Sequence, residues 1–297
     1  GLKMITPALC FQHVTKSFEN IVALDSISID VPPNSIFGLL GPNGSGKSTL
    51  MRILSGLIKT WDGNISISGE DYSSSTQGYI NKLGFLIEAP SFYEYLSAIE
   101  NLKILSRLTN LNNDKIEEAL DVVNLTDRSY DKVKTFSYGM KQRLGLAQCL
   151  LHDPEMLILD EPNNGLDPSG IREMSKIINN LHKNGKTICV STHILSEVDT
   201  LCTHAAVLKK GKHIATVKLD DDYHADTTYL LNVDNASSSF KLLSTDKNFD
   251  LKLVDDNSLI VKTRVQDAVK VIREKISETN TVHSLSKQSN LIVYFDD

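Results

Sequence analysis

The sequence contains 297 residues, of which 41% are hydrophobic and 23% charged, enough apolar material for one large domain or two unequal ones. The net charge of −6 argues against a general nucleic-acid binder, because such proteins need a basic surface. No apolar run approaches the roughly 18 residues that a transmembrane helix requires, and no stretch has the pattern of a signal peptide. Four cysteines without C-x-x-C spacing are interpreted as reduced core thiols of a cytosolic protein.

Two stretches near the N-terminus, residues 8–14 and 21–31, alternate apolar and polar side chains, which predicts half-buried strands. Phe18 lies between them at a predicted turn. Its ring could stack on a nucleotide base, although an aromatic residue of the core would give the same pattern. The sequence leaves both interpretations open.

The stretch GPNGSGKST fits the pattern G-x-x-x-x-G-K-[ST]. It consists of Gly41, Pro42, Asn43, Gly44, Ser45, Gly46, Lys47, Ser48 and Thr49. An apolar run predicts a strand before it, and helical spacing predicts a helix after it, which argues against a glycine-rich turn that matches by chance. Glycines let the loop curl so that its amides face a phosphate chain. Lys47 would add charge there and Ser48 would ligate Mg²⁺, so we predict a site for ATP and magnesium.

The middle of the sequence begins with strands at 63–69 and 83–87, the second of which ends at Glu88. Residues 91–151 are then mainly helical, with Asn113 or Asp114 as a candidate cap. Within this part, Phe136-Ser137-Tyr138-Gly139-Met140 directly precedes a helical run. Serine and glycine at a helix start offer a hydroxyl and free amides, which suit an anion.

Two further strands end in polar residues. Met156 to Leu159 is an apolar strand that ends in Asp160 and Glu161, and residues 187–191 form a strand followed by His193. Sites of α/β sheets lie at the carboxyl edge of their strands. Asp160 is therefore a candidate for Mg²⁺, and Glu161 for polarising the attacking water. Pro168 opens a helix after Asp167, and short strands at 205–208 and 213–217 complete this part.

The remaining sequence reads as a separate unit. Residues 219–226 are acidic and polar, which predicts a linker. Strands are expected at 228–233, 251–254, 258–262 and 291–295, with a short helix after the first and a longer one from Val265 to Ile276. The order βαββαβ predicts a small ferredoxin-like α+β domain over residues 227–297.

The ordered motifs resemble those of the ATP-binding subunit of an ABC transporter, over about residues 9–218. The resemblance implies a P-loop NTPase of the α/β class, an ABC ATPase with an antiparallel β subdomain and a helical subdomain, in residues 1–218. It also implies a homodimer that sandwiches two ATP molecules. In that family the roles would be base stacking by Phe18, catalysis by Glu161, γ-phosphate sensing by His193, a contact across the dimer by Asp167, and contacts in trans by the signature residues Ser137, Tyr138, Gly139 and Met140.

Two motifs depart from the usual family pattern. The signature reads FSYGM where LSGGQ is usual, and Glu88 stands at the position usually held by glutamine. Both resemble the branch that exports bacitracin or gives immunity to lantibiotics. A carboxylate about 4 Å from a phosphate charge would be repelled by about 4 kcal/mol at an effective dielectric of 20. We therefore expect Glu88 to face the metal or the membrane partner.

The resemblance implies an ATP hydrolase that powers a peptide-antibiotic exporter at the cytoplasmic face of the membrane, with the permease on separate chains and no nucleic-acid partner. Other classes are weighed against it. A translation or DNA-repair ATPase of this family would have two cassettes in tandem or a long coiled coil, and neither is recognised in this sequence. A GTP switch would need a carboxylate where Asn81-Lys82-Leu83-Gly84 has glycine. A sensor in which the tail binds a ligand stays open.

Overall fold

The computed structural model describes residues 5–72, 81–108, 114–277 and 279–295. The chain divides into two compact units. The first takes in the residues up to Ile194 together with 201–217, and the second takes in 195–200 and the residues from Lys218 onward. The predicted linker, residues 219–226, contains a short helix, α8 (Asp221–Ala225), whose first turn is capped by the Asp220 carboxylate through Tyr223 N at 3.3 Å.

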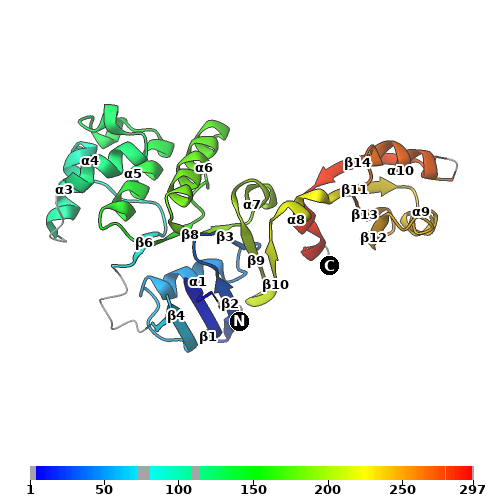
Figure 1. Ribbon diagram of the computed structural model, residues 1–297, viewed down its shortest axis with the longest axis horizontal. Coiled ribbons are helices and arrows are strands. Elements are labelled where there is room, and N and C mark those ends of the chain that lie inside the picture. The colour runs from blue at the N-terminus through cyan, green and yellow to red at the C-terminus, as the bar shows by residue number, and fades with distance from the viewer. Residues whose placement is uncertain (1–4, 73–80, 109–113, 278, 296–297) are drawn as a thin grey trace. The chain divides into compact units, whose positions relative to one another are not determined.

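A six-stranded sheet in the order β10-β9-β3-β8-β7-β6 is the centre of the first unit (Figure 1). Its strands are β3 (Ile36–Leu40), β6 (Leu83–Leu86), β7 (Met156–Asp160), β8 (Thr187–Thr192), β9 (His204–Lys209) and β10 (Lys212–Lys218). β3 pairs in parallel with β8 and β9, and β7 pairs in parallel with β6 and β8. The carboxyl ends of β3, β7 and β8 therefore meet at one edge, where Leu40 lies opposite Thr192 and Asp160 opposite Ser191.

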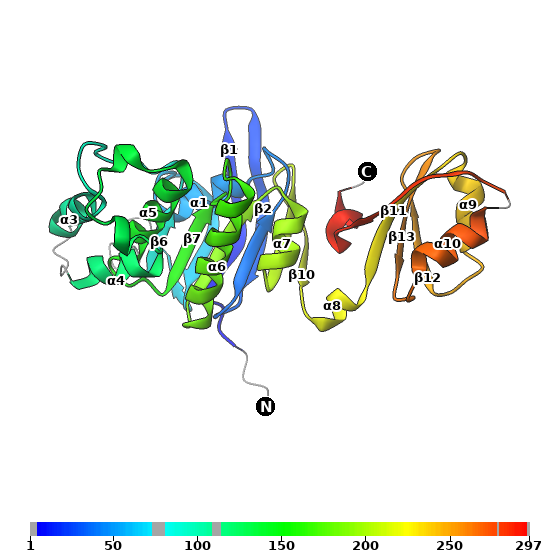
Figure 2. The same cartoon turned by 90° about the horizontal axis from the view of Figure 1, so that it is seen from above.

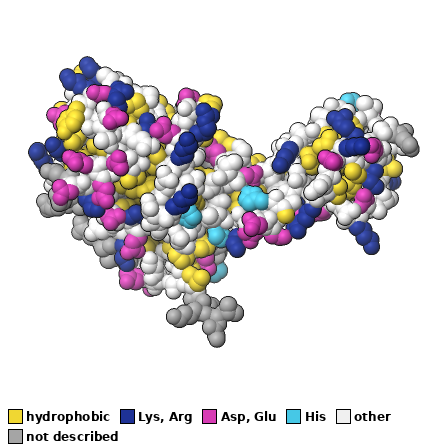
Figure 3. Space-filling model, turned by 45° about the horizontal axis from the view of Figure 1, so that its top comes forward, with side chains coloured by type: hydrophobic (Ala, Val, Ile, Leu, Met, Phe, Trp, Pro, Cys, Tyr) yellow, Lys and Arg dark blue, Asp and Glu magenta, His cyan; other side chains and the backbone are white. Residues whose placement is uncertain are grey.

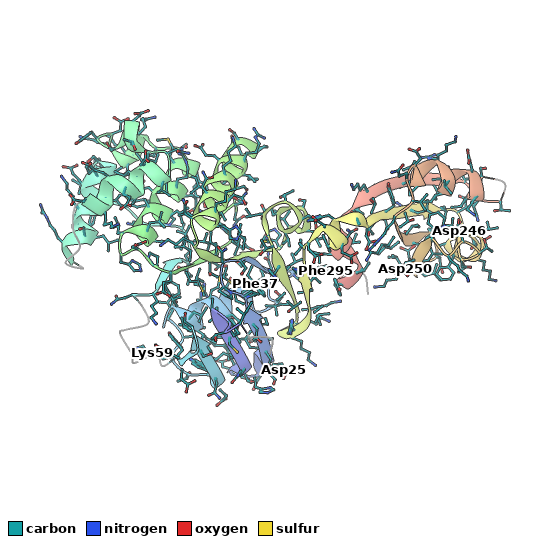
Figure 4. The ribbon with its side chains drawn as sticks, viewed as in Figure 1. Asp25, Phe37, Lys59, Asp246, Asp250 and Phe295 are labelled. Carbon is teal, nitrogen blue, oxygen red and sulfur yellow. The ribbon has the colours of Figure 1, made fainter. Side chains whose placement is uncertain are left out.

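A second, antiparallel sheet has the order β2-β1-β4-β5. It consists of β1 (Leu9–Phe18), β2 (Ile21–Val31), β4 (Asp62–Ile67) and β5 (Glu70–Asp71). Helix α1 (Lys47–Leu54) buries Leu50, Met51 and Ile53 in a core that both sheets share. Phe37 of β3, labelled in Figure 4, is fully buried in the same core. This shared core fixes the start of α1 against the end of β3.

Helices cover the rest of the first unit. α3 (Ala98–Leu108), α4 (Asp114–Val122) and α5 (Tyr138–Leu150) contact one another, and α5 contacts β6 (Figures 1 and 2). Two short 3₁₀ helices, η1 (Thr126–Arg128) and η2 (Val133–Thr135), connect α4 to α5. α4 begins at Asp114, while Asn113 lies outside the described residues. α6 (Pro168–Lys183) packs beside β8, and α7 (Leu195–Leu201) is a helix that the sequence pattern did not predict.

The second unit has the strand and helix order βαββαβ that the sequence predicts. Its elements are β11 (Thr227–Val233), α9 (Ala236–Leu243), β12 (Phe249–Leu253), β13 (Ser258–Thr263), α10 (Ala268–Ile276) and β14 (Val282–Gln288). The sheet is antiparallel with the order β12-β13-β11-β14. Leu231, Val261 and Ile272 are fully buried in its core. Asp246, labelled in Figure 4, joins α9 to β12 and pairs with Lys275 of α10 at 3.2 Å.

The prediction of a last strand at residues 291–295 is wrong. Residues 291–294 belong to a 3₁₀ helix, η3 (Asn290–Tyr294), which Phe295 ends, and the last strand among the described residues is β14. Thr228 donates to the Asn290 side chain at 2.7 Å, which in turn donates to the carbonyls of Tyr223 and Asp226 at 2.9 and 3.0 Å. β14 is an edge strand with mostly polar residues, so its pattern gave a weaker signal than the apolar Leu291 to Val293.

Among the described residues, no helix is both long enough and apolar enough to cross a bilayer. On the face drawn in Figure 3, basic and acidic side chains are interspersed over the coloured residues, without a continuous basic stripe.

Candidate functional site

The glycine loop connects β3 to α1, as the motif predicts. Gly44 and Gly46 have φ values of 81° and 108°, in the left-handed region that glycine tolerates. Gly41 is needed for a different reason, because a β-carbon there would lie 2.3 Å from the carbonyl oxygen of Leu208. The loop therefore keeps its curl only with glycine at these positions.

Two side chains of this loop, those of Ser45 and Lys47, offer hydrogen-bond donors that suit an anion. The Ser45 hydroxyl is buried and has no hydrogen-bond partner among the described residues. Lys47 is 4% exposed, and its ammonium donates to the carbonyls of Gly41 and Pro42 at 2.7 and 3.1 Å. Burial lowers the pKa of Lys47 below 10.5, while the carboxylates of Glu161 and Asp160 act in the opposite direction. An unpaired hydroxyl and a lysine without a carboxylate in contact suit a phosphate chain.

The acidic edge of the sheet faces this loop. The Ser48 hydroxyl donates to Oδ1 of Asp160 at 3.2 Å, which joins α1 to the end of β7. Nδ1 of His193 lies 3.0 Å from Oε1 of Glu161, so the residue after β8 contacts the residue after β7. Glu161 has a φ of 45°, an uncommon conformation for a side chain with a β-carbon. The structure thus brings Lys47, Ser48, Asp160, Glu161 and His193 together.

The oxygen atoms of Ser48 and Asp160 fit a magnesium ion. Mg²⁺ prefers oxygen ligands and is commonly bound by one or two protein oxygens together with substrate phosphates. Among the residues that the structure describes, there is no group of three or more His, Cys, Asp or Glu side chains that would hold a metal by themselves. A hydroxyl and a single carboxylate beside a phosphate loop suit a metal ion that binds together with a nucleotide.

The signature residues form a second location. Ser137 caps α5, and its hydroxyl accepts from the amide of Met140 at 3.2 Å. Asp167 caps α6 in the same way through Gly170 at 2.8 Å. The two helix starts border a hollow of about 410 Å³ that is lined by Ser137, Gly139, Met140, Arg143 and Asp167 among others. The hollow is open to the outside and contains no residue of the phosphate loop.

Tyr138 links these two helix starts. A β-carbon at Gly165 would lie 3.2 Å from Cε1 of Tyr138, so the phenol ring rests on the glycine of the loop before α6. Gly165 has a φ of 76°, and Tyr138 is 47% exposed. The residue that departs from the usual signature therefore contacts the loop of Asp167 in its own chain.

Two other predicted site residues lie at the surface. Glu88 follows β6 with a φ of 68°, and its carboxylate accepts from Nη2 of Arg52 at 2.9 Å. Both side chains are largely exposed, and the pair joins α1 to the loop after β6. Phe18 ends β1 and is 45% exposed, with Nζ of Lys16 4.9 Å from the centre of its ring. An exposed ring face beside a cation is compatible with stacking on a base.

The comparisons with known proteins agree with this arrangement. The family model described as ABC transporter matches residues 24–164. An uncharacterized ABC transporter ATP-binding protein of Bacillus subtilis, YhcH, is 38% identical over 276 residues, which cover 89% of this chain and 90% of the relative. The chain belongs to the ATP-binding proteins of ABC transporters. It is an ATP hydrolase of that family, an ABC ATPase, as its motifs predicted.

More specific names occur among other relatives of this ABC transporter ATPase. The bacitracin transport ATP-binding protein BcrA of Bacillus licheniformis is 41% identical over 73% of the chain and 72% of the relative. The lantibiotic transport ATP-binding protein SrtF of Streptococcus pyogenes is 40% identical over 71% of the chain and 91% of the relative. The predicted resemblance to this branch is confirmed.

The solved structures confirm the fold of the ABC ATPase. CbiO1 of Clostridium perfringens, part of the ABC transporter complex CbiONQ, has a TM-score of 0.67 at 25% identity and covers 74% of the chain and 91% of its own. The ATP-binding cassette MJ0796, in a dimeric post-hydrolysis state with ADP and Pi, has a TM-score of 0.63 at 24% identity, over 71% of this chain and 99% of its own. The P-loop class is therefore confirmed, and nucleotide binding follows from the family.

Reasoning from the sequence missed two residues of this site. Ser191 contacts both Asp160 and Glu161, at 2.5 and 2.9 Å, and Arg52 holds Glu88. Ser191 looks like an ordinary serine of a buried strand until the register of β7 with β8 sets it opposite Asp160. Arg52 carried no signal in the sequence either, because arginine is common on exposed helix faces.

Proposed function

We propose that this ABC ATPase powers the export of a peptide antibiotic, of the bacitracin or lantibiotic class, through a permease on separate chains. Two copies would hold two Mg-ATP between them at the cytoplasmic face of the membrane. The observation that carries the proposal is the convergence of Lys47, Ser48, Asp160, Glu161 and His193 at one sheet edge. The names of the bacitracin and lantibiotic relatives support the cargo class.

The loop and its lysine are the proposed phosphate-binding part of the site. The amides at the start of α1 point partial positive charge at a bound anion, and Lys47 would exchange its two carbonyl partners for phosphate oxygens. Ser48 and Asp160 would hold Mg²⁺, which neutralises charge that develops on the phosphates when it is bound. Phe18 would stack on the base, beside Lys16.

Glu161 is the proposed general base. Its carboxylate would accept the proton of the water that attacks the γ-phosphate, and His193 would keep that carboxylate in place through its 3.0 Å contact. His193 lies at the end of β8 beside the phosphate loop strand, so it would also sense whether a γ-phosphate is present. General base catalysis of this kind contributes typically 10²- to 10⁴-fold to a rate.

The signature residues are proposed to act in trans. Ser137 to Met140 and Asp167 border an open hollow that excludes the phosphate loop of the same chain, which supports a role toward the nucleotide of a second copy. The amides at the starts of α5 and α6 suit a terminal phosphate there. The dimeric state of the similar cassette MJ0796 supports a dimer here.

The loop after β6 and the nearby helices are the proposed docking surface for the permease. Tyr93 and Tyr95 are 65% and 78% exposed, which is unusual for aromatic side chains of a surface without a partner. Glu94 pairs with Lys141 of α5 at 2.5 Å, so this loop is tied to the signature helix. Glu88 stands at the start of the same loop, where it would face the permease.

Glu161→Gln tests the function of the site. The variant should hydrolyse ATP at least 100-fold more slowly and should form dimers with ATP and Mg²⁺ that persist during size-exclusion chromatography. Hydrolysis at the parent rate would refute the role of Glu161.

The cargo is tested by co-expression with adjacent membrane-protein genes. Resistance to bacitracin or to a lantibiotic should appear with the parent chain and vanish with Glu161→Gln, whereas equal sensitivity of both strains to these peptides would remove the cargo proposal.

A further inference from the structure

Ser191 is a buried serine between the two acids of the site. It is the fifth residue of β8, fully buried, and lies opposite Asp160 in the parallel register. Its hydroxyl donates to Oδ1 of Asp160 at 2.5 Å and accepts from the amide of Glu161 at 2.9 Å. One hydroxyl therefore satisfies a side chain and a backbone group of two consecutive residues.

The two hydrogen bonds of Ser191 fix conformations that Asp160 and Glu161 would not keep without a partner. Glu161 has a φ of 45°, and left-handed backbone at such a residue persists only where its surroundings fix it. The amide of Glu161 is partly buried and needs a hydrogen-bond partner, which Ser191 supplies. Oδ1 of Asp160 also accepts from Ser48, so two serine hydroxyls, one from α1 and one from β8, hold the same carboxylate oxygen.

Ser191 and His193 act on the same residue from one strand end. Two residues apart, they reach Glu161 at different places: Ser191 holds its backbone, and His193 contacts its carboxylate at 3.0 Å. The carboxylate direction depends on both, because a rotation of the backbone would move Oε1 away from His193.

We propose that Ser191 is a positioning residue for ATP hydrolysis, which sets the direction of the Asp160 carboxylate and the backbone of Glu161 without touching ATP. The inference rests on the roles proposed above for Asp160 and Glu161. It predicts that loss of the hydroxyl harms the catalytic step and the use of magnesium, while the affinity for nucleotide without metal stays the same. If Ser191 only filled space, its loss would not lower catalysis and the use of magnesium while leaving the affinity for metal-free nucleotide unchanged.

The experiment compares Ser191→Ala, Ser191→Cys and Ser191→Thr in the full chain. Cysteine keeps the volume but bonds weakly, and threonine keeps the hydroxyl. Ser35→Ala is the matched control, since Ser35 is also buried, lies just before β3, and donates to the carbonyl of Pro32, outside the site. For each variant, kcat, KM for ATP and the melting temperature are measured. Binding of a fluorescent non-hydrolysable ATP analogue is titrated with and without Mg²⁺.

We expect kcat to fall at least tenfold in Ser191→Ala and Ser191→Cys, with the Mg²⁺ concentration for half-maximal analogue binding raised about threefold or more. Binding without Mg²⁺ should stay within twofold, and Ser191→Thr should recover kcat to within about threefold. Unchanged kcat and Mg²⁺ dependence in the alanine and cysteine variants would overturn the proposal. So would equal losses in all three variants, or failure of all three to fold while Ser35→Ala folds. Glu161→Gln is measured in parallel, because its activity at the parent rate would remove the proposed function itself, whatever Ser191 does.

Discussion

Nδ1 of His193 lies 3.0 Å from Oε1 of Glu161, although the two residues follow different strands and are 32 positions apart in the sequence. The register of β7 with β8 brings the two residues near each other, since it pairs Asp160 with Ser191, and Glu161 and His193 follow that pair by one and two residues. Glu161 is therefore held at two places, at its backbone amide by Ser191 and at its carboxylate by His193.

His193→Ala should lower kcat by about 10- to 100-fold, which corresponds to about 1.4–2.7 kcal/mol of transition-state stabilisation. KM for ATP should change less than threefold, because the histidine contacts Glu161, the proposed general base, and not the phosphate loop. Steady-state kinetics checks this. His182→Ala is the matched control, since His182 pairs with the carbonyl of Asn34 at the end of α6. A kcat of His193→Ala equal to that of His182→Ala would contradict the prediction.

Lys47→Met should weaken ATP binding at least 100-fold without destabilising the nucleotide-free protein. The pKa of Lys47 is lowered by burial, so the unfolded chain binds this proton more readily and the charge costs stability in the empty site. Stability of the nucleotide-free parent should therefore rise as the pH increases toward 10.5, relative to Lys47→Met. Urea titrations at pH 7 and 9.5 measure this difference.

Lys59→Met serves as the control for the lysine variant. Lys59 is exposed in the loop before β4 (Figure 4) and has no place in the site. Its substitution should leave both ATP binding and the pH dependence of stability as in the parent. If Lys47→Met retains ATP as tightly as Lys59→Met does, the loop is not the phosphate site.

Exchange of the charges of Arg52 and Glu88 tests the role of that pair. The ion pair is exposed, so either single reversal should cost less than about 1 kcal/mol of unfolding free energy. ATP hydrolysis by the isolated protein should stay within twofold, because Glu88 does not contact the phosphate loop in the described structure. Hydrolysis coupled to the permease should fall in Glu88→Arg and should recover in the double reversal Arg52→Glu/Glu88→Arg. If Glu88→Arg drives transport at the parent rate, the loop acid has no active role.

Asp226→Asn should destabilise the second unit at neutral pH. A hydrogen bond from Arg264 and another from Lys262 hold the pKa of Asp226 below its usual value. A depressed carboxyl pKa stabilises the fold above the ordinary value of about 3.9, and this stability is lost as the pH falls through the folded-state pKa. We expect Asp226→Asn to lose about 1 kcal/mol of unfolding free energy at pH 7. Its stability should also fall less steeply than that of the parent as the pH is lowered. Hydrogen exchange of β11 and β13 against pH measures it, with the exposed Asp250→Asn on β12 as the control (Figure 4).

Much of this structure is predictable because the responsible signals are local. Gly41 to Thr49 carries its loop conformation in its own residues, and the apolar run before Asp160 and Glu161 is long enough only for a buried strand. Parallel strands then place their carboxyl ends together, so Lys47, Glu161 and His193 could be assigned to one edge. The chemistry of the site follows from those two facts.

The remainder depends on contacts between distant residues. Ser191 looks like an ordinary strand serine until the register sets it opposite Asp160. α7 is only seven residues long and its apolar pattern is too short to separate from a loop. The last strand was misplaced because Asn290 and the buried Leu291 turn an apolar run into η3, while the mostly polar residues 282–288 pair with β11.

The ring of Tyr138 on Gly165 has a mechanical consequence. Any side chain at position 165 would crowd the ring, so glycine lets the first turn of α5 approach the loop before α6 closely. A small tilt of α5 would therefore also move the loop before α6 and its cap Asp167, so the positions of the two helix starts are coupled.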